Sequence, residues 1–355
     1  MTLPEKIQTW QMVEPGKLER TSIDVPELQP GEVLVEVAAC GVCHTDVGYF
    51  YDGVPTVSKP PLTLGHEISG RVVAGDEKLL GKEVIVPAVM PCNNCEICAS
   101  GRGNRCLKQK MPGNSMGIYG GFSTHIPVPS ADLCVIEDRK GMPLEHFAVV
   151  ADAITSPYQA AKRAEISPGD NVVVIGATGG IGVYMTQIAA AMGAKEVIAI
   201  ARNKEKLQRS LDFGATHALS TLDKSVKDIR DEYRAYCKEK GLPTYGWKFF
   251  ECTGSKMGQE IALELLSFVG KMMVVGYGMQ KVEYMLSRLM AFDAEIIGTW
   301  GCLPKYYPEV LQMVLEGKIK VEPFVDLRPM SQIEQAFKES HSGKLMKRVV
   351  LIPDF

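Results

Sequence analysis

The feature that most constrains the fold of this chain is a glycine-rich segment between an apolar run and a stretch of helical periodicity. The run at 171–175 is Asn-Val-Val-Val-Ile, which is typical of a strand buried on both faces of a parallel sheet. From Ile181 to Met192 the apolar residues recur at the spacing of an amphipathic helix, and a second apolar run follows at 196–201. This order of strand, glycine turn, helix and strand predicts a doubly wound parallel sheet of the Rossmann type.

The glycine-rich segment itself predicts a dinucleotide site. Glycines at such a corner let the backbone approach a pyrophosphate, and the N-terminus of the following helix favours its negative charge. A tight turn without a ligand is the alternative, but the strand before the corner and the helix after it argue against this. The residues predicted to contact the cofactor are Gly176, Thr178, Gly179, Gly180, Ile181 and Gly182.

Length and composition limit the class of protein. A chain of 355 residues exceeds one ordinary domain and predicts two. The 39 Lys and Arg against 42 Asp and Glu give a net charge of −3, so we expect neither nucleic acid nor an anionic membrane as a partner. The longest apolar runs, such as 172–175, are too short to span a bilayer, and residues 1–12 lack a signal-peptide core. We therefore expect a soluble, cytoplasmic protein.

The two parts of the chain differ in their patterns. The first 150 residues are rich in strand and turn signals, such as the alternating Val33, Val35 and Val37, and poor in helical periodicity. This part is predicted to be an antiparallel, barrel-like β domain. The part after Ala151 alternates strand and helix patterns, as expected for an α/β domain.

Four cysteines predict a structural metal site. They stand as Cys92-x-x-Cys95-x-x-Cys98-x7-Cys106, so that four thiolates can surround one tetrahedral ion. A site with four protein ligands has no open position for a substrate, which indicates structural zinc. A pair of local disulfides and an iron–sulfur cluster are the alternatives.

A second group of ligand types lies upstream, at Cys43 and at His66. One thiolate and one imidazole can bind a zinc ion and leave room for a third ligand and a substrate oxygen. A cysteine and a histidine 23 residues apart are weak evidence by themselves. The alternative is a buried small hydrophobic residue and a hydrogen-bonded core histidine.

These motifs together resemble the zinc-dependent medium-chain alcohol dehydrogenases. The segments Gly41-Val-Cys-His-Thr-Asp and Gly65-His-Glu, the four cysteines and the glycine corner occur in the family's order, and the resemblance covers essentially the whole chain. It implies an α/β protein with a GroES-like β-barrel catalytic domain and a Rossmann cofactor domain. The implied ranges are 1–154 with 305–355 for the catalytic domain, including a zinc lobe at about 88–110, and 155–304 for the Rossmann domain.

The resemblance also implies the ligands of a catalytic zinc. Cys43 and His66 match two family ligands, Glu67 is a carboxylate that can approach the metal, and Asp46 orients His66. The third ligand of the family is usually a cysteine, and Asp152 occupies its position here. We predict Asp152 as the third ligand, which would leave the metal more Lewis acidic. The alternative is that Asp152 caps the following helix while Glu67 or water completes the coordination.

Other family roles fall on residues near these ligands. Thr45 lies where the family places a hydroxyl that relays the substrate proton towards the cofactor ribose. Some relatives end this relay in a histidine, and Gly48 stands at that position here. His44 and Arg348 match family positions that contact the pyrophosphate.

The choice between NAD and NADP depends on the end of the second strand. Ala201 stands where NAD enzymes usually carry an acid, and the neighbouring Arg202 would ordinarily indicate a 2′-phosphate. The resemblance implies NAD, which we predict, with NADP possible through Arg202. Two zinc ions per chain, one catalytic and one structural, complete the predicted cofactors.

Within the family, the sequence resembles dehydrogenases that act on an alicyclic hydroxyacyl-CoA in anaerobic degradation of aromatic compounds. This likeness implies oxidation of a ring secondary alcohol by NAD. A secondary-alcohol or polyol dehydrogenase with a non-CoA substrate is one alternative, and a catalytically silent dinucleotide-binding protein is another. Residues 295–301 resemble the family's subunit-contact strand, which implies a homo-oligomer, predicted to be a tetramer.

Overall fold

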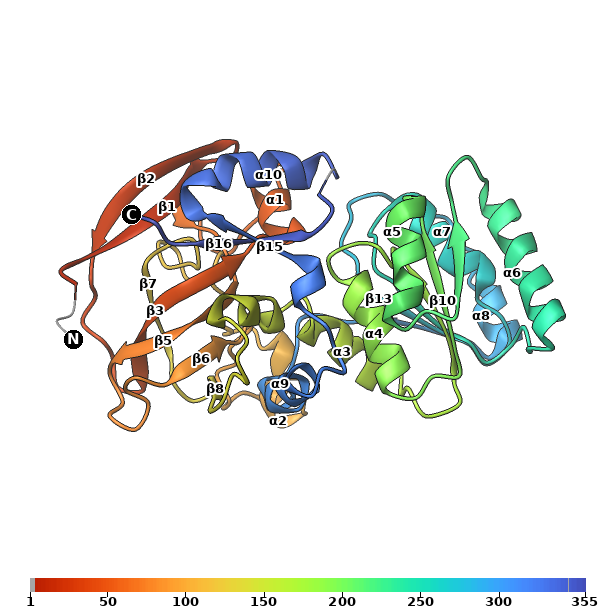
Figure 1. Ribbon diagram of the computed structural model, residues 1–355, viewed down its shortest axis with the longest axis horizontal. Coiled ribbons are helices and arrows are strands. Elements are labelled where there is room, and N and C mark those ends of the chain that lie inside the picture. Colours follow the sequence, from red (N-terminus) through yellow and green to blue (C-terminus); the bar gives the residue numbers. More distant parts are fainter. Residues whose placement is uncertain (1–3, 344) are drawn as a thin grey trace. The chain divides into compact units, whose positions relative to one another are not determined.

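The chain forms two compact units (Figure 1). A computed structural model describes residues 4–343 and 345–355. Unit 1 contains Met1–Thr155, Gly301–Glu316 and Val321–Phe355. Unit 2 contains Ser156–Trp300 and Gly317–Lys320. The boundaries of the catalytic and Rossmann domains predicted from the sequence remain a prediction.

Unit 1 is built on two sheets. Its strands are β1 (Lys6–Glu14), β2 (Lys17–Asp24), β3 (Glu32–Gly41), β4 (Leu62–Thr63), β5 (Glu67–Ala74), β6 (Glu83–Val86), β7 (His125–Pro129), β8 (Cys134–Ile136), β15 (Val325–Pro329) and β16 (Arg348–Ile352). The smaller sheet has the order β2–β1–β4, and the larger has the order β15–β16–β3–β5–β6–β8, with β7 also paired to β3. Among the described strands of this unit only β15 and β16 pair in parallel. The first part of the chain is therefore rich in antiparallel strands, as the sequence predicted.

The core of unit 1 forms around β3. Val33, Leu34 and Val35 are fully buried, and β3 has strand partners along both edges. Phe122 and Phe337 meet in the same core with their rings at a steep angle, 5.6 Å between centroids. Complete burial of each such side chain contributes roughly 1.5–3 kcal/mol, so apolar packing explains why this apolar segment becomes a central strand.

Short helices complete unit 1. They are α1 (His44–Tyr51), α2 (Glu96–Ala99), α9 (Tyr307–Leu315) and α10 (Ile333–His341), with the 3-10 helices η1 (Gly103–Arg105), η2 (Leu144–Ala151), η4 (Pro304–Tyr306), η5 (Glu322–Phe324) and η6 (Met330–Gln332). Helix α1 begins after Cys43, whose backbone N–H donates to the Asp46 carboxylate at 3.1 Å. Helix α10 packs on α1 through an edge contact between Phe337 and Phe50, with 5.3 Å between ring centroids.

Unit 2 is a six-stranded parallel sheet with helices. Its strands are β9 (Asn171–Ile175), β10 (Glu196–Ala201), β11 (His217–Ser220), β12 (Lys248–Glu251), β13 (Lys271–Val274) and β14 (Glu295–Gly298). Its helices are α3 (Thr155–Arg163), α4 (Gly182–Ala191), α5 (Lys204–Arg209), η3 (Ser210–Phe213), α6 (Val226–Lys240), α7 (Lys256–Leu265) and α8 (Ser287–Phe292). The first residue of α3, Thr155, belongs to unit 1. The strand order is β11–β10–β9–β12–β13–β14. The doubly wound sheet predicted from the glycine corner is thus confirmed, and β9 and β10 have the predicted bounds.

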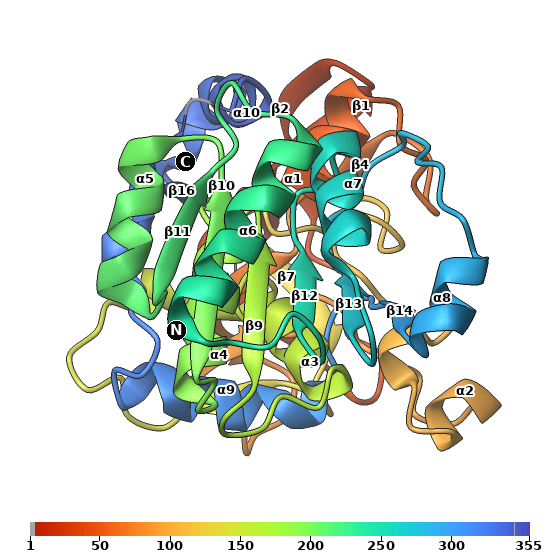
Figure 2. The same cartoon turned by 90° about the vertical axis from the view of Figure 1, so that its right-hand side faces the viewer.

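The sheet of unit 2 is covered by apolar side chains of its helices. Helices α6 and α7 lie over one face (Figure 2), where Tyr233 and Ile261 join Val173 and Ile198 in one buried cluster. The order of the strands reverses between β9 and β12, the point at which open α/β sheets bind ligands. None of the helices within the described ranges is long and apolar enough to cross a membrane.

Candidate active site and metal centres

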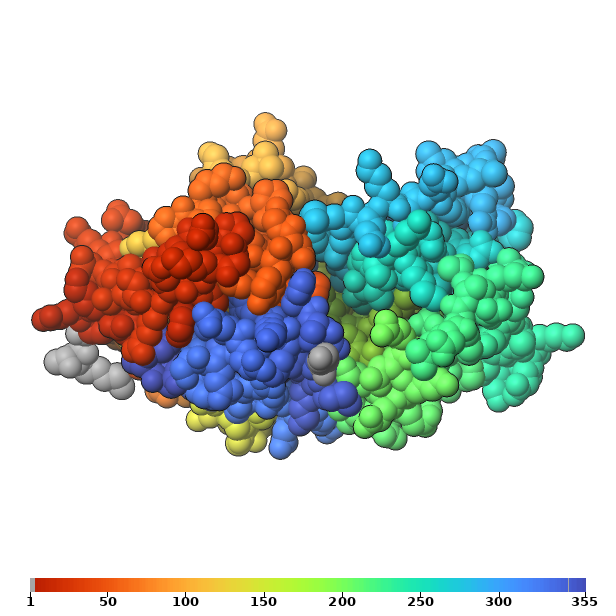
Figure 3. Space-filling view, turned by 90° about the horizontal axis from the view of Figure 1, so that it is seen from above, coloured from red at the N-terminus to blue at the C-terminus, as the bar shows by residue number. Residues whose placement is uncertain are grey.

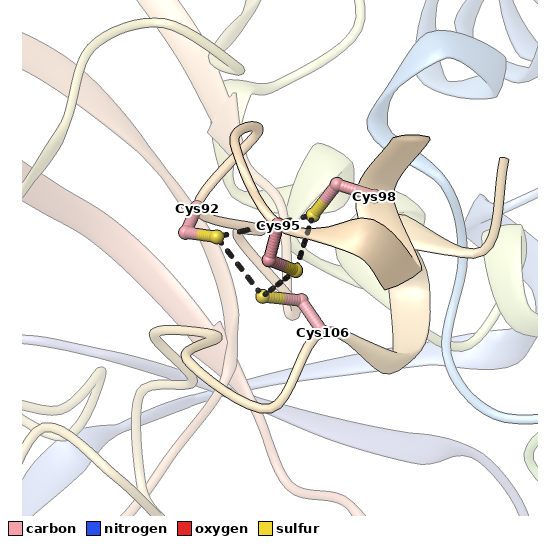
Figure 4. Close-up of side chains that lie close together, drawn as sticks. All are labelled: Cys92, Cys95, Cys98 and Cys106. Carbon is pink, nitrogen blue, oxygen red and sulfur yellow. Dashed lines mark hydrogen bonds between the residues drawn. The ribbon is translucent and has the colours of Figure 1, made fainter. Parts of the chain in front are cut away.

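Four cysteine side chains converge around α2 (Figure 4). The Sγ–Sγ distances are 3.4 Å for Cys92–Cys106, 3.5 Å for Cys95–Cys98, 3.8 Å for Cys95–Cys106 and 4.0 Å for Cys92–Cys98. Thiolates bound to one tetrahedral zinc ion at about 2.3 Å lie about 3.8 Å from one another. A disulfide needs about 2.05 Å between sulfurs, and the cysteines are free thiols. The cluster fits a single ion and not the alternative of local disulfides.

Local backbone conformation brings these sulfurs together. Asn93 and Gly101 adopt the left-handed conformation, with φ of 57° and 78°, and turn the chain on either side of α2. Cys95 stands at the N-terminus of α2 and Cys98 within it. Hydrogen bonding from the Cys98 backbone and from the neighbouring thiols lowers the pKa of Cys95 to about 7. A lowered thiol pKa favours the thiolate, which is the form that binds metal.

A second cluster gathers in unit 1 around the start of α1. Single ligand atoms of Cys43, His66, Glu67 and Asp152 lie within 4.8 Å of one another. His66 Nε2 is 3.6 Å from Asp152 Oδ2, and Cys43 Sγ is 3.9 Å from the same oxygen. His66 and Glu67 are buried, whereas the Asp152 side chain is 14% exposed. Three donors of different chemistry thus face one point, with access on the side of Asp152.

Different elements supply these ligands. Cys43 precedes α1, His66 immediately precedes β5, and Asp152 immediately follows η2. The pairing of β5 with β3, whose end leads into Cys43, brings Cys43 and His66 together. Asp152 lies 109 positions from Cys43 and joins them because η2 packs against β3 and β5. The structure brings together the three predicted ligands, although their role as zinc ligands stays a prediction.

Asp46 holds the first two ligands in place. Its fully buried carboxylate accepts hydrogen bonds from the backbone N–H of Cys43 at 3.1 Å and of Gly65 at 2.9 Å. His66 Nδ1 lies 3.3 Å from Asp46 Oδ1, a close contact without the angle of a normal hydrogen bond. The ring therefore directs Nε2 towards Asp152, which is the arrangement expected when a carboxylate orients a metal-binding imidazole.

The electrostatics of this cluster favour a cation. Burial lowers the pKa of His66, but Asp46, Cys43 and Asp152 outweigh burial and raise this pKa well above the usual range. An imidazolium in the protein without metal would thus supply the positive charge that the anionic groups require. A divalent ion satisfies the same groups and needs the imidazole neutral, so the donor set fits zinc.

Glu67 makes an ion pair with Arg348. Arg348 Nε donates to Glu67 Oε2 at 2.7 Å, and the guanidinium also donates to Oε1, so both carboxylate oxygens are engaged. Burial raises the pKa of Glu67 to about 7 against the effect of Arg348, while the paired guanidinium stays protonated. A Cβ atom at Gly41 would lie 2.2 Å from Glu67 Oε2, so the pair requires glycine there. The predicted pyrophosphate contact of Arg348 stays a prediction.

The remaining predicted residues of unit 1 lie beside the cluster. The Thr45 hydroxyl is 3.6 Å from Cys43 Sγ. Burial lowers the pKa of His44, Asp52 opposes this shift, and the charges of His341 and Arg348 add to it. The balance of these effects lowers the pKa of His44.

Sequence reasoning missed one residue that supports the site. Tyr307 is fully buried, and its hydroxyl accepts from the Ala88 backbone N–H at 3.1 Å and donates to the Ala151 carbonyl. Ala151 immediately precedes Asp152, so Tyr307 fixes the segment that carries this carboxylate. No motif marks Tyr307, because its partners lie 219 and 156 positions away.

The glycine corner of unit 2 has the geometry of a close turn. Gly176 has φ of 84°, and a Cβ atom at Gly182 would lie 2.0 Å from the Gly176 carbonyl oxygen. At Gly179 the nearest atom to such a Cβ would be 3.3 Å away. The corner connects β9 to α4 at the reversal of strand order, so Gly176 to Gly182 fit a dinucleotide pyrophosphate. Arg202 follows β10 directly and is exposed.

Comparison with known proteins decides the family. Residues 29–138 match the family "Alcohol dehydrogenase GroES-like domain", and residues 180–316 match "Zinc-binding dehydrogenase". An alcohol dehydrogenase of Geobacillus stearothermophilus is 30% identical over 342 residues, covering 95% of this chain and 96% of that protein. The chain belongs to the zinc-dependent medium-chain alcohol dehydrogenases. The predicted fold class, a GroES-like catalytic domain with a Rossmann cofactor domain, is confirmed.

Two further medium-chain dehydrogenases are similar along nearly their whole length. Sorbitol dehydrogenase of Bombyx mori is 29% identical over 343 residues, covering 92% of this chain and 93% of that protein. The structure of acetophenone reductase from Geotrichum candidum in complex with NAD is 26% identical, with a TM-score of 0.85, covering 99% and 98%. The predicted class, an NAD-dependent zinc-containing alcohol dehydrogenase, and the predicted cofactors, zinc and NAD, are confirmed at the level of the family.

Proposed function

We propose that this protein oxidises a secondary alcohol to a ketone at the Cys43–His66–Asp152 cluster. The observation that carries the proposal is the convergence of a thiol sulfur, an imidazole nitrogen and a carboxylate oxygen at separations suited to one metal ion. Three protein ligands leave a fourth position for a substrate oxygen, as in catalytic zinc sites. The four cysteines around α2 form a closed set and hold the structural zinc.

The residues around the cluster have separate tasks. A bound zinc ion supplies a Lewis acid that lowers the pKa of the alcohol. Asp46 keeps the His66 ring in its binding orientation, and Asp152 supplies a harder ligand than the thiolate usual in the family. Thr45, whose hydroxyl lies beside Cys43, accepts the alcohol proton while it donates its own proton onward. Glu67 is a second carboxylate near the cluster, held back by Arg348.

The glycine corner of unit 2 holds the dinucleotide, which supplies the hydride acceptor. The N-terminus of α4 and the close turn of Gly176 to Gly182 support this assignment. His44 and Arg348 contribute to binding the pyrophosphate. NAD is the preferred cofactor, and Arg202 allows measurable turnover with NADP because its guanidinium can pair with a 2′-phosphate.

The substrate that the comparisons favour is a polyol or another secondary alcohol without CoA. The relatives include a sorbitol dehydrogenase and an L-galactonate-5-dehydrogenase, both named for hydroxylated carbon chains. Polyol recognition requires polar groups near the metal, and the Thr45 hydroxyl and Asp152 carboxylate supply two.

The second candidate substrate is 6-hydroxycyclohex-1-ene-1-carbonyl-CoA, oxidised to the 6-oxo thioester. The motif resemblance supports it, and Tyr51 offers a 41% exposed aromatic side chain for an alicyclic ring. Phe50 is buried against Phe337 and belongs to the core. A CoA substrate also needs cationic contacts, and one candidate, Arg288, is already paired with Glu264 at 3.3 Å.

A dehydrogenase assay distinguishes these substrates. Reduction of NAD is followed at pH 7 with sorbitol, galactonate, cyclohexanol, the cyclic hydroxyacyl-CoA and the free acid of that thioester. The proposal expects turnover with an alcohol that lacks CoA. Turnover of the thioester more than about 100-fold above its free acid, with no other substrate active, would establish the second candidate. If the enzyme reduces NAD with none of these alcohols, the result would contradict both candidate substrates.

The protein is also proposed to be a cytoplasmic homo-oligomer, and a tetramer by its likeness to the family. The edge strand β14 has a partner strand only on the side of β13 among the described strands, and the side chains of Met285, Leu286 and Met290 nearby are 67–78% exposed. A second copy that pairs along this edge would cover these apolar groups. Light scattering at several protein concentrations tests the assembly, and a monomer throughout would contradict it.

A further inference from the structure

The oxidation of an alcohol releases a hydride, which the dinucleotide accepts, and one proton, which must reach solvent. In the proposed reaction this proton first meets the Thr45 hydroxyl, beside ligands that are almost fully buried. The histidine that ends the relay in some relatives is replaced by Gly48. Another group has to receive the proton, and its identification rests on the proposed function.

Helix α1 leaves a slot at Gly48. His44, Gly48 and Asp52 follow one another at four-residue intervals and therefore lie on one side of the helix. A Cβ atom at Gly48 would lie 3.4 Å from Val54 Cγ2 and 4.0 Å from Asp52 Oδ2; apart from the helix backbone and the two chain neighbours, no other described atom would lie within 4 Å. The space that a larger residue would fill is thus bordered by Val54 and by the carboxylate of Asp52.

A histidine from α10 meets this carboxylate. His341 Nε2 lies 3.2 Å from Asp52 Oδ1, and its ring stacks on Tyr51 with 4.6 Å between centroids. Helix α10 (blue) lies at the surface of unit 1 beside the segment that contains α1 (Figure 3), held by the Phe50–Phe337 contact. The side chains of His341 and Asp52 are 47% and 38% exposed. The pair is therefore held in place and open to water.

We propose that the Asp52–His341 pair receives the proton of the oxidation and passes it to solvent. A proton that reaches the pair converts the neutral imidazole and the carboxylate into an imidazolium–carboxylate ion pair. The exposed ring then loses a proton to water, which restores the starting state. An imidazole ring can accept a proton at one nitrogen and release one from the other, which suits such a transfer.

Several described charged groups lie near the pair. His44 lies within electrostatic reach of both Asp52 and His341, and Arg348 within reach of His44. Lys338 precedes His341 by one turn of α10. Arg348 is neutralised by Glu67, so Asp52 is the anionic group that stabilises a protonated His341.

The test uses the complete enzyme with zinc and NAD. The variants are His341→Ala, His341→Gln and Asp52→Asn, with Lys338→Gln as a control on the same helix. The rate of the first turnover of NADH formation is measured at pH 7 in a non-nucleophilic buffer, with and without added imidazole. Quenching of tryptophan fluorescence gives the affinity for NAD independently of turnover, and circular dichroism confirms folding.

Each outcome decides the inference. We expect the first-turnover rate of His341→Ala to fall about tenfold, less than the full effect of general acid–base catalysis because water is a competing acceptor. Added imidazole should restore the rate of His341→Ala to within about twofold of wild type. It should not restore the rate of His341→Gln, in which the glutamine side chain occupies the place of the ring. The affinity for NAD should be the same in the variants as in wild type. An unchanged rate in His341→Ala, or a loss that imidazole does not reverse, would overturn the proposal. If wild type turns over no alcohol, the proposed function and this inference fall together, whereas an active wild type with unaffected variants removes the inference alone.

Discussion

Removal of one buried hydroxyl should show how the Asp152 segment is fixed. In Tyr307→Phe the ring stays and keeps its packing, but the hydroxyl that bridges the Ala88 N–H and the Ala151 carbonyl is lost. Tyr307 is fully buried, and Ala88 is 2% exposed. The Ala88 N–H is therefore left without a partner in a place that excludes solvent, whereas the Ala151 carbonyl keeps its hydrogen bond from the Thr155 hydroxyl at 3.1 Å.

The magnitude of the destabilisation follows mainly from the unpaired Ala88 N–H. A buried donor or acceptor that loses its partner destabilises the protein by about 1–3 kcal/mol. One such group is left in Tyr307→Phe, and we expect a loss of about 2 kcal/mol. A loss of 2 kcal/mol corresponds to roughly a 30-fold increase in amide exchange where exchange follows opening of this segment.

Hydrogen exchange measured by mass spectrometry is the suitable assay, because a chain with two units need not unfold in a single step. Peptides that contain Ala88 and Ala151 should exchange about 30-fold faster in Tyr307→Phe than in wild type. The matched control is Tyr233→Phe in unit 2. The Tyr233 hydroxyl is buried but makes no hydrogen bond of normal geometry to a described residue, so its removal should change stability little. Equal exchange in wild type and Tyr307→Phe at both peptides would refute the reasoning.

Three further predictions concern the metal lobe and the cofactor. Cys95→Ser should lower the zinc content from about two to about one per chain and destabilise the lobe, because the remaining thiolates cannot close a tetrahedron; retention of two zinc ions would count against the structural site. Gly182→Ala should lower NAD affinity at least tenfold, since its Cβ would meet the Gly176 carbonyl at 2.0 Å, whereas Gly179→Ala should have a much smaller effect in the same fluorescence titration. Arg202→Ala should reduce kcat/KM for NADP more than that for NAD, and an equal effect on both would show that Arg202 does not meet the 2′-phosphate.

Features with a local pattern could be predicted from the sequence. The glycine corner and the strands β9 and β10 could be predicted from residues within about 30 positions of one another. In this segment the spacing of the apolar residues and the glycines of the turn indicate the same structure. The four cysteines are similarly local, since their spacing of two, two and seven intervening residues lets one loop surround an ion. Physical constraints on short segments are therefore readable without tertiary structure.

The support of the catalytic cluster could not be predicted in this way. The ion pair of Glu67 and Arg348 joins residues 281 positions apart, and it depends on the register that places Gly41 opposite both Glu67 and Val350. The contact between Asp52 and His341 spans 289 positions and depends on the packing of α10 on α1. Charge and hydrogen-bonding capacity are visible in a sequence, but the choice of partner is made by tertiary packing.

The identity of the substrate could not be predicted from the sequence for a related reason. Selectivity between similar alcohols depends on a few side chains, and one methylene group changes it by only about 1–3 kcal/mol. Polyols and alicyclic thioesters both present a secondary alcohol to the same metal cluster. The assay panel, and not the ligand set, separates them.

The zinc content of Cys43→Ala tests the central claim most directly. Wild type and variant are purified without added metal, and the zinc content per chain is measured by elemental mass spectrometry. In a separate experiment, cobalt replaces zinc, and the absorption spectrum reports whether thiolates bind the metal at each site. The account predicts about two zinc ions in wild type and about one in Cys43→Ala, with the four-cysteine cobalt spectrum retained and hydride transfer abolished. Two zinc ions and unchanged turnover in Cys43→Ala would contradict it.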